Sequence, residues 1–427
     1  MTSSQANKSL LTRLLELWQG WSFGTKTLGA MFVGAALGFW IGPPIAAVQP
    51  IGEMFIRALI MSAIPLVFFN LLAGLTSAGD IKLLGRVGLR IILCYLFSTV
   101  VALSLGLTII HWLKPGLGIP LRAEVSQEIG SVPSIANTLM DLVPRNVFQA
   151  LTSGNVAQIA VFAALLGVAT VMLPTDKREP LARAYTLVAD ALRQLTTLIM
   201  GIAPLGVAAL AAVTAGEYGT TILGSLSLFI GGVWLAQLLV AIFYLVVLRL
   251  VTGTRPLDFL QRTSSLYATT IATCSSLASL AVTMDVADKR LGIPRRIYAI
   301  TLPLGSQFNK DGTSVTLAAI LLFTAQAAGV HFDLGTIISI LFVGLILSEG
   351  IGGVPGGGLV IAMIFVKAFN LPVEVAAIVG GVYRFFDMSN TTINCMGDLV
   401  WTKVVARFES SQATAPAIKA QPDQPTA

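Results

Sequence analysis

Two carboxylates and three other polar side chains lie in a stretch whose flanks are apolar enough for a membrane: Asp387, Asn390, Thr391, Asn394 and Asp398. Counted from Asp387, the others follow at offsets of three, four, seven and eleven. A helix that turns about 100° per residue therefore presents all five on one face. An ionisable side chain at bilayer depth costs roughly 3 kcal/mol and normally faces a polar interior or a solute path. The pattern predicts the wall of a solute or ion site; a helix with one wet face at the membrane edge is the alternative.

The composition indicates an integral membrane protein. Of the 427 residues, 55% are hydrophobic and only 11% are charged, whereas soluble domains carry about 25% charged residues. Long apolar stretches, several exceeding the roughly 20 residues that a spanning helix needs, are separated by short basic loops. In the first part of the chain the expected spans are 27–48, 52–77, 87–112, 155–173, 184–214 and 220–251.

The distribution of Lys and Arg predicts the orientation in the membrane. Basic clusters in alternating loops fall on the same side as the N-terminal arm, which by the positive-inside rule is cytoplasmic, as is the C-terminal tail. We expect the plasma membrane, in a bacterium the inner membrane, and no cleavable signal peptide. The net charge of +6 lies mostly in loops and tails, so no nucleic-acid partner is expected.

Few residues suit catalysis or a structural metal. The histidines are too few and too distant, and the cysteines too isolated, for a metal site or a disulfide framework: His111, His331, Cys94, Cys274 and Cys395. A Ser/Lys pair of Ser275 and Lys310 is conceivable for an intramembrane enzyme. These two residues lie in separate elements, so we expect no enzyme.

After about residue 255 the sequence shows two similar units. Residues 264–280 are apolar but crowded with hydroxyl groups, and residues 337–366 are interrupted by the glycine-rich segment 348–358. Each is expected to form a helical hairpin that turns back within the membrane, where irregular backbone can line a cavity. Each is followed by a helix with charges at mid-depth, at 309–313 and 387–398. Paired interrupted segments of this kind indicate the binding site of a transporter.

Several motifs resemble those of one transporter family. They are the serine-rich tip at 274–279, Asn-Lys-Asp-Gly-Thr at 309–313, Gly-Val-Pro-Gly-Gly-Gly at 353–358, and the Asp…Asn…Asp pattern of 387–398. Together with Tyr95, Ser98 and Thr99 on the third helix, they resemble the dicarboxylate/amino acid:cation symporters, the family of the bacterial and brain glutamate transporters. The resemblance implies an all-α membrane protein with eight transmembrane helices and two re-entrant helical hairpins, assembled as a homotrimer.

The resemblance also implies that the chain forms two domains with different roles. A scaffold of helices 1, 2, 4 and 5 would hold a transport domain of helices 3, 6, 7 and 8 and both hairpins, which moves across the bilayer like an elevator. The expected segments are a cytoplasmic arm (1–25), helices 1 to 6 (26–254), a transport core with the hairpins and helices 7 and 8 (255–407), and a disordered cytoplasmic tail (408–427).

Roles for single residues follow from the same resemblance. Asp387 would hold the α-ammonium of an amino acid, and the substrate contacts would be Ser276, Thr313, Val354, Asp387, Asn390, Thr391 and Asn394. One sodium site would use Asp398 with the carbonyls of Gly305, Asn309 and Asn394, and a second would use Tyr95, Ser98, Thr99, Asn309 and Asp311. Oxygen ligands around a carboxylate suit a hard monovalent cation. Apart from the coupling ion, Na⁺ or H⁺, no cofactor is expected.

Three residues depart from the pattern of that family. Asn390 stands where members that carry acidic substrates have an arginine, and an amide brings no charge to clamp a carboxylate. Lys310 replaces a methionine and Glu349 an apolar residue, both beside a further sodium site of the family. An ion pair of Lys310 with Glu349 would replace a cation. Alternatively, Lys310 snorkels and Glu349 faces water.

These observations favour a secondary active symporter that moves a neutral or small polar amino acid inward with a cation. The alternative within transport is an acidic amino acid or C4-dicarboxylate symporter coupled to Na⁺ or H⁺, in which Arg384, one turn before Asp387, serves as the clamp. A gated channel or a transporter-derived receptor is a third class, which flux stoichiometry would separate from coupled transport.

Overall fold

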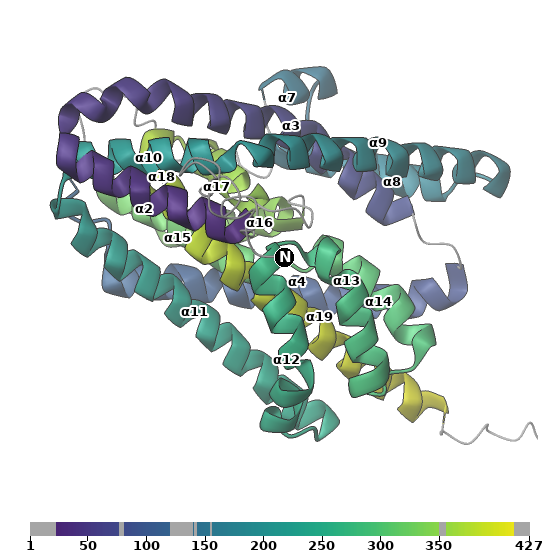
Figure 1. Ribbon diagram of the computed structural model, residues 1–427. Helices are drawn as coiled ribbons and strands as arrows, with labels where there is room; N and C mark the ends of the chain where they lie inside the picture. The colour runs from purple at the N-terminus through teal and green to yellow at the C-terminus, as the bar shows by residue number, and fades with distance from the viewer. Residues whose placement is uncertain are drawn as a thin grey trace, which may run out of the picture.

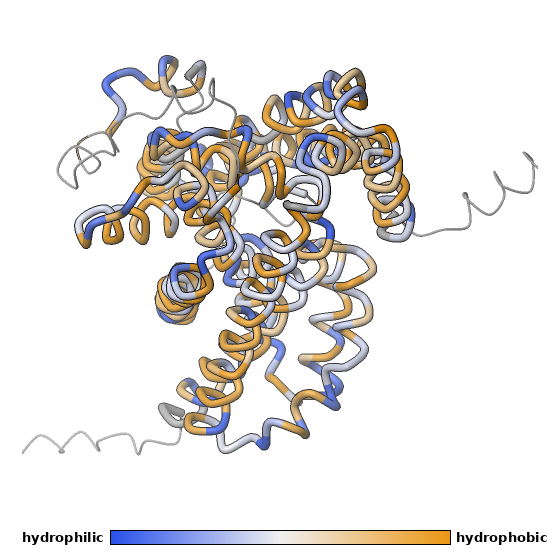
Figure 2. Tube along the Cα trace, turned by 90° about the vertical axis from the view of Figure 1, so that its left-hand side faces the viewer, coloured by the Kyte–Doolittle hydropathy of each residue, from blue (hydrophilic) through white to orange (hydrophobic). Residues whose placement is uncertain are grey.

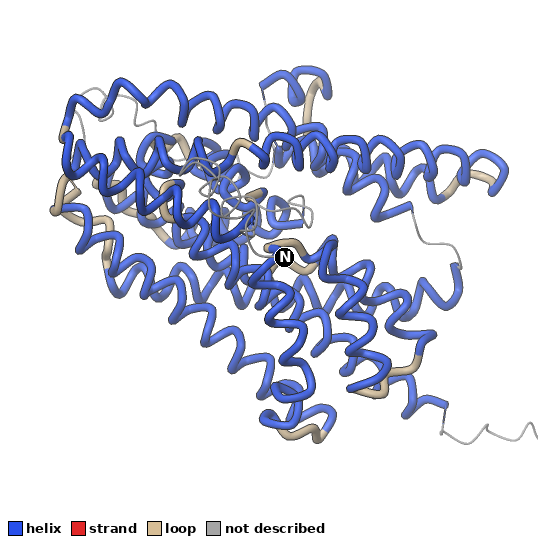
Figure 3. Tube along the Cα trace, viewed as in Figure 1, coloured by secondary structure: helices blue, strands red, loops and turns tan. Residues whose placement is uncertain are grey.

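The computed structural model of this chain describes residues 23–76, 81–119, 140, 143–153, 156–349 and 356–413. All regular elements within these ranges are helices (Figures 1 and 3). The first part of the chain contains α2 (Phe23–Ile41), η1 (Pro43–Val48), α3 (Gln49–Thr76), α4 (Ile81–Leu113), α7 (Val147–Ser153), α8 (Val156–Val171), α9 (Thr175–Gly201), α10 (Ala203–Tyr218) and α11 (Thr221–Thr252).

The second part contains the two interrupted units. Its elements are α12 (Pro256–Thr273), α13 (Ser276–Asp285), η2 (Val286–Arg290), α14 (Arg295–Phe308), α15 (Asp311–Ala327), α16 (Leu334–Glu349), α17 (Gly357–Ala368), α18 (Val373–Gly380) and α19 (Tyr383–Ala413). The pairs α12–α13 and α16–α17 each pack against one another, in the two segments where hairpins are expected. Each pair is followed by a polar helix that begins or is broken at the site.

Three helical segments of the described residues are long and apolar enough to cross a membrane: Pro43–Thr76, Arg86–Leu113 and Ile222–Thr252. A fourth span arises if α9 and α10 are taken together. Apolar residues run along nearly all the helices (Figure 2), and many large ones are exposed, among them Trp40, Met54 and Leu250. Such exposure is expected where lipid replaces water as the solvent. The eight spans of the sequence prediction are thus matched only in part by helix length and apolarity.

Three expected boundaries are wrong. The span at 184–214 is two helices, bent by 53°, because Pro204 in the first turn of α10 lacks the N–H that would continue α9. The tail expected to be disordered from residue 408 is helical as far as Ala413. At the other end α2 begins at Phe23, within the expected arm.

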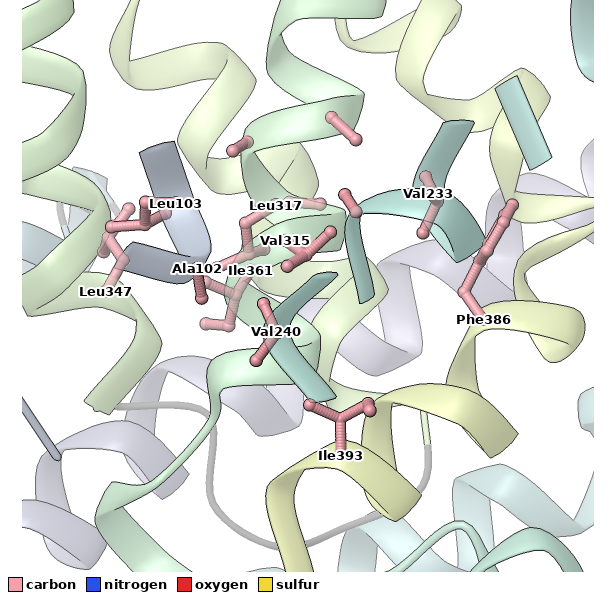
Figure 4. Packing of buried hydrophobic residues seen from close by; sticks show 14 of the residues in the cluster. Ala102, Leu103, Val233, Val240, Val315, Leu317, Leu347, Ile361, Phe386 and Ile393 are labelled. Carbon is pink, nitrogen blue, oxygen red and sulfur yellow. The ribbon is translucent and has the colours of Figure 1, made fainter. Parts of the chain in front are cut away.

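Helix α15 lies at the centre of the larger hydrophobic core. Every residue from Asp311 to Ala325 is buried, and α15 packs against α4, α11, α16, α17, α18 and α19. Figure 4 shows Val315 and Leu317 of α15 among Ala102 of α4 and Ile361 of α17. Beyond its polar first turn α15 is mainly apolar on all sides, and such a helix is stable when neighbouring helices surround it. This position fixes the first turn of α15 against the polar face of α19.

A second, smaller core joins α2, α3, α9 and α10. Its members include Met31, Phe55, Leu59, Met200 and Val207. Helices α2 and α10 approach closely because Gly34 and Gly38 of α2 lie against the backbone of α10 at Ala208 and Ala212, where a Cβ atom would clash. Helix α3 also packs on α8 and α9. These helices form one layer above the core that contains α15 (Figure 1).

Candidate functional site

The candidate site begins at the interruption between α14 and α15. Asn309 and Lys310 are not helical, whereas Asp311, Gly312 and Thr313 already belong to the first turn of α15. The end of α14 offers carbonyl groups and the start of α15 offers N–H groups that no intrahelical partner uses. The expected break at 309–313 is therefore present, two residues long.

The polar stripe of α19 faces this break. Asp387, Asn390, Thr391, Asn394 and Asp398 are each at most 6% exposed. All five therefore lie in the interior, and the alternative of a wet face at the membrane edge is wrong. The stripe lies beside α15, α11 and α14, on which α19 packs.

Asp398 is the centre of one group of oxygen atoms. The Asn309 side-chain amide donates to Asp398 Oδ1 at 2.9 Å and to the carbonyl of Asn394 at 3.0 Å. The backbone at Gly305 lies so close that a Cβ there would be 2.5 Å from Tyr95 Oη and 2.7 Å from Asp398 Cγ. Asn309 Oδ1 is buried and accepts no hydrogen bond within the described part of the chain. A buried acceptor beside a carboxylate suits a cation or a further donor.

Asp311 is the centre of a second group. Thr99 of α4 donates to its Oδ1 at 2.7 Å, and the Tyr244 hydroxyl of α11 donates to its Oδ2. Ser98 donates to the Tyr95 carbonyl at 3.1 Å and accepts from Trp401 Nε1. Three helices thus converge on one buried carboxylate.

Tyr95 belongs with the first group rather than the second. Its hydroxyl donates to the carbonyl of Thr301 at 3.1 Å and lies next to Gly305. Of the residues expected to share a cation site with Asp311, Thr99 donates a hydrogen bond to it and Ser98 also lies close to it. Asn309 connects the two groups, because its side chain donates to Asp398 and it lies two residues before Asp311 in the chain.

Asn394 fastens α19 to the first turn of α15. Its Oδ1 accepts the backbone N–H of Gly312 at 2.8 Å, and its Nδ2 donates to Thr313 Oγ1 at 3.3 Å. Its own carbonyl accepts from Asn309. Asn394 thus contacts both the Asp398 group, through Asn309, and Thr313, an expected substrate contact.

Asn390 is held by the protein's own polar groups. Its Oδ1 accepts from Gln237 Nε2 at 2.7 Å and from Thr316 Oγ1 at 2.8 Å, and its Nδ2 donates to the Tyr383 hydroxyl at 3.4 Å. Gln237 also donates to the carbonyl of Gly312 at 3.3 Å. The amide of Asn390 is thus part of a buried network that joins α11, α15 and α19.

Asp387 contacts the backbone just before the start of α17. Its Oδ2 accepts the backbone N–H of Gly356 at 3.0 Å, and Arg384 Nη1 lies 3.5 Å from the same oxygen. Gly356 has a φ of 74°, which a residue with a side chain adopts only under strain. The Arg384 side chain is 3% exposed. A buried carboxylate and a buried guanidinium therefore adjoin where the second hairpin meets α19.

A cavity of about 370 Å³, including space open to solvent, adjoins this pair. Its lining includes Arg384, Asp387 and Gly356 together with Phe55 of α3 and Val207 of α10. Thr27 and Tyr383 also line the cavity, and nearly all of the surface that faces it is apolar.

The first hairpin turns at a strained residue. Cys274 has a φ of 50° although it carries a side chain, a conformation that costs energy and is found mainly at turns and functional sites. Ser275 then caps α13 by accepting the N–H of Ala278 at 3.1 Å. Ser276 is buried. Thr270 of α12 and Thr392 of α19 are 2.9 Å apart, so this hairpin is also joined to the stripe helix.

Lys310 is 1% exposed, and its Nζ donates to the carbonyl of Ser306 at 2.5 Å. Since the side chain stays in the interior, the alternative that it snorkels to the surface is wrong. The expected partner Glu349 ends α16 and its side chain lies outside the described residues, as does Val354, an expected substrate contact.

Four residues of the site were not expected from the sequence: Gln237, Tyr244, Thr316 and Tyr383. Gln237 is a lone amide in the middle of an apolar span, and Tyr244 follows two helical turns later on the same face. An isolated polar side chain in a spanning helix is the sequence signal by which Gln237 and Tyr244 can be recognised.

The described residues contain no group of three or more His, Cys, Asp and Glu side chains that would hold a metal ion. The two carboxylate groups are instead surrounded by hydroxyl, amide and carbonyl oxygens. Such an arrangement suits a weakly held monovalent cation or a proton better than a tightly bound transition metal.

Comparison with known proteins agrees with this geometry. The family described as "Sodium:dicarboxylate symporter family" matches residues 23–408. A proton/glutamate-aspartate symporter of Bacillus subtilis (strain 168) is 30% identical over 393 residues, which cover 90% of this chain and 94% of that protein. A proton/sodium-glutamate symport protein of Bacillus caldotenax is 29% identical over 395 residues, 89% and 93% of the two chains. A C4-dicarboxylate transport protein of Anaeromyxobacter sp. (strain K) is 30% identical over 406 residues, 92% of each.

Proposed function

Because this chain belongs to the sodium:dicarboxylate symporter family, whose members are membrane transporters, we propose that it carries an acidic amino acid into the cell with a cation. Similar proteins are named for glutamate, aspartate and C4-dicarboxylates. They support a cation-coupled symporter and do not support the neutral or small polar amino acid expected from Asn390. The structure offers a reason for that difference, since the Asn390 amide is engaged by Gln237, Thr316 and Tyr383.

The observation that carries the proposal is the buried Arg384 beside Asp387. A guanidinium binds a carboxylate with two parallel hydrogen bonds, which adds both energy and specificity. In the proposal Arg384 binds the side-chain carboxylate of the substrate and Asp387 binds its α-ammonium. An acidic amino acid has both partners, whereas a C4-dicarboxylate has none for Asp387.

The remaining substrate contacts are proposed from their place around this pair. Thr391 and Asn394 follow Asp387 on the same face of α19, and Thr313 is hydrogen bonded to Asn394. Ser276 and Val354 would supply backbone groups from the two hairpin tips. The hydrogen bond from Gly356 to Asp387 supports a role of the second hairpin in covering the substrate.

Two cation positions are proposed. One comprises Asp398 with oxygens of Gly305, Asn309 and Asn394; the buried Asn309 Oδ1 supports it. The other comprises Asp311 and Asn309 with Tyr95, Ser98 and Thr99, now joined by Tyr244. Either Na⁺ or H⁺ fits these oxygens.

The packing supports an elevator arrangement. Helices α2, α3, α8, α9 and α10 pack mainly on one another and would be the scaffold, while α4 and α11 to α19 pack around α15 and would move. We further propose a homotrimer in the bacterial inner membrane, with both termini in the cytoplasm.

Uptake into proteoliposomes tests the substrate class. Labelled aspartate should accumulate under an inward Na⁺ or H⁺ gradient and should be displaced best by aspartate or glutamate in a screen of the amino acids and C4-dicarboxylates. Arg384→Met should weaken acidic substrates at least about tenfold, as expected for losing one partner of a buried charge pair, and Arg384→Lys should restore part of the affinity. Stronger competition by serine or alanine would reverse the proposal, and stronger competition by succinate would favour the dicarboxylate alternative.

A further inference from the structure

We propose that the ammonium group of Lys310 is a resident counter-ion that takes the place of one coupling cation. The inference rests on the proposed symport and concerns its stoichiometry. It predicts that the protein moves one monovalent cation fewer per substrate than it would with an uncharged residue at this position.

The first support is the place of the side chain. Lys310 lies in the break between α14 and α15 and is 1% exposed. Its Nζ donates to the carbonyl of Ser306, in the last turn of α14, at 2.5 Å. Carbonyl groups at the end of a helix carry a partial negative charge and attract cations. The ammonium therefore occupies a position that would suit a metal cation equally well.

The second support is the pair of carboxylates beside it. Asp311 follows Lys310 in the chain, and Asp398 accepts a hydrogen bond from Asn309, which precedes Lys310. The two carboxylates are 0% and 2% exposed. A buried ammonium is costly unless negative groups compensate it. A carbonyl at a helix end with carboxylates nearby is also the environment that hard cations prefer.

The third support is the balance of buried charge. Among the described residues, the buried acidic and basic side chains of the site are three carboxylic acids and two basic groups: Asp311, Asp387, Asp398, Lys310 and Arg384. The buried Glu409 is paired with Arg86 and Arg90 near the end of α19, apart from the site. One negative charge of the site is left over when Lys310 is charged, and two when it is replaced by an uncharged residue. Each unmatched charge would have to be neutralised by a cation from solution before the site crosses the apolar core.

A purely structural role is the competing explanation. Lys310 would then tie α14 to the break through Ser306 without affecting ion stoichiometry. The two explanations differ in one measurable quantity, the number of cations bound. Lys310→Met removes the charge and keeps an unbranched chain, Lys310→Gln keeps a donor without charge, and Lys310→Arg keeps the charge.

The decisive experiment measures charge per substrate from reversal potentials in proteoliposomes. Lys310→Met and Lys310→Gln should raise the number of coupled charges per substrate by about one and steepen the Na⁺ dependence of uptake accordingly. Lys310→Arg should keep the wild-type value. Lys289→Met is the control, since Lys289 is exposed and pairs with Asp285 on the surface; it should change nothing. An unchanged stoichiometry in both neutral variants overturns the inference.

A binding measurement without substrate separates this inference from the proposed function. Thermal unfolding of the purified protein is followed as Na⁺ replaces choline. Each additional bound ion increases the Na⁺-dependent rise in Tm, so Lys310→Met or Lys310→Gln should show a larger rise than the wild type and Lys310→Arg should not. If acidic substrates fail in the wild type but this difference appears, the substrate proposal is wrong and the role of Lys310 stands. Equal rises in the wild type and in whichever neutral variant assembles refute the counter-ion.

Discussion

Gln237 Nε2 donates a 2.7 Å hydrogen bond to Asn390 Oδ1 in the interior of the protein. This contact joins the middle of α11 to the polar face of α19, and Thr316 of α15 donates to the same oxygen. Asn390 is also the position from which the sequence predicts the substrate class. The hydrogen bonds of its amide link α11, α15 and α19.

Gln237→Leu should lower the stability of the protein. The substitution removes one of the two side-chain donors to Asn390 Oδ1 and one of the two side-chain donors to the Gly312 carbonyl. A buried polar group that loses its partner costs roughly 1–3 kcal/mol. The measurement is thermal unfolding in detergent. Leu238→Met on the adjacent, 56% exposed position is the control. An unchanged Tm for Gln237→Leu would contradict a structural role of the network.

Asp387→Asn should weaken binding of an amino acid substrate at least about tenfold, since loss of one member of a buried, hydrogen-bonded charge pair typically costs about 2–5 kcal/mol. Asparagine retains the size of the side chain and an oxygen for the Gly356 N–H, so the protein should still assemble. Substrate affinity can be read by calorimetry. Ser389→Ala should leave the affinity as it was, because the Ser389 hydroxyl bonds to the backbone carbonyls of Phe385 and Phe386 in its own helix. If Asp387→Asn binds as tightly as the wild type, Asp387 does not contact the ammonium.

The features predicted correctly from the sequence are those with a local signature. The offsets of Asp387, Asn394 and Asp398 specify one helical face, and the cost of exposing a carboxylate to lipid specifies that this face is buried. The polar insertion at 309–313 likewise predicted a break, because the apolar pattern on either side stops there. Hydroxyl-bearing residues marked the first interrupted segment at 264–280, and glycine and proline marked the second at 353–358.

The features that were missed depend on contacts between distant segments. Gln237 and Tyr244 lie in an otherwise uniform apolar span, and only the folded chain brings them to Asn390 and Asp311. The bend at Ile202 was missed because hydropathy is continuous across it, although Pro204 is a local sequence signal for a helix break. The helix beyond residue 408 was missed because its stabilising partners for Glu409 are more than 300 residues away.

Neutralising Asp311 or Asp398 should reduce the cation dependence of substrate binding. Cation and substrate binding are linked, so loss of a cation position lowers the effect of the cation on substrate affinity by the same factor in both directions. The measurement is the substrate Kd at low and high Na⁺, repeated at several pH values, for Asp311→Asn and Asp398→Asn. Asp288→Asn, an exposed carboxylate of η2, should retain the wild-type dependence. If the wild-type Kd depends on pH but not on Na⁺ and both variants lose this dependence, H⁺ is the coupling ion. If both variants keep the wild-type cation dependence, these two carboxylates do not bind the coupling ion.

Asp333 makes the stability of α16 depend on pH. Its carboxylate accepts the Thr336 N–H at 2.7 Å, and hydrogen bonding to Thr336 lowers the pKa of this exposed carboxyl group. A lowered pKa in the folded state means that the stabilisation is complete above the unfolded pKa and is lost as the pH falls through the folded one. Asp333→Asn should keep the cap, because asparagine also caps helices, but should flatten the decline in Tm at acid pH. A decline as steep as in the wild type would assign it to other groups.

Glu409 should fasten the end of α19 to α4. Its side chain is 6% exposed and accepts from Arg86 Nη2 and Arg90 Nη1, each at 2.5 Å. Breaking a buried ion pair from one side costs about 3–5 kcal/mol. Because Arg86 is 55% exposed, water screens part of this interaction. We therefore expect Glu409→Gln to lower the free energy of unfolding by about 1–3 kcal/mol. Unfolding should respond less to salt in this variant. Glu53→Gln is the matched control, because its pair with Arg57 lies on the surface at 3.6 Å and should contribute at most about 0.5 kcal/mol. If the two substitutions lower Tm equally, the burial of Glu409 does not make its ion pairs more stabilising than a surface pair.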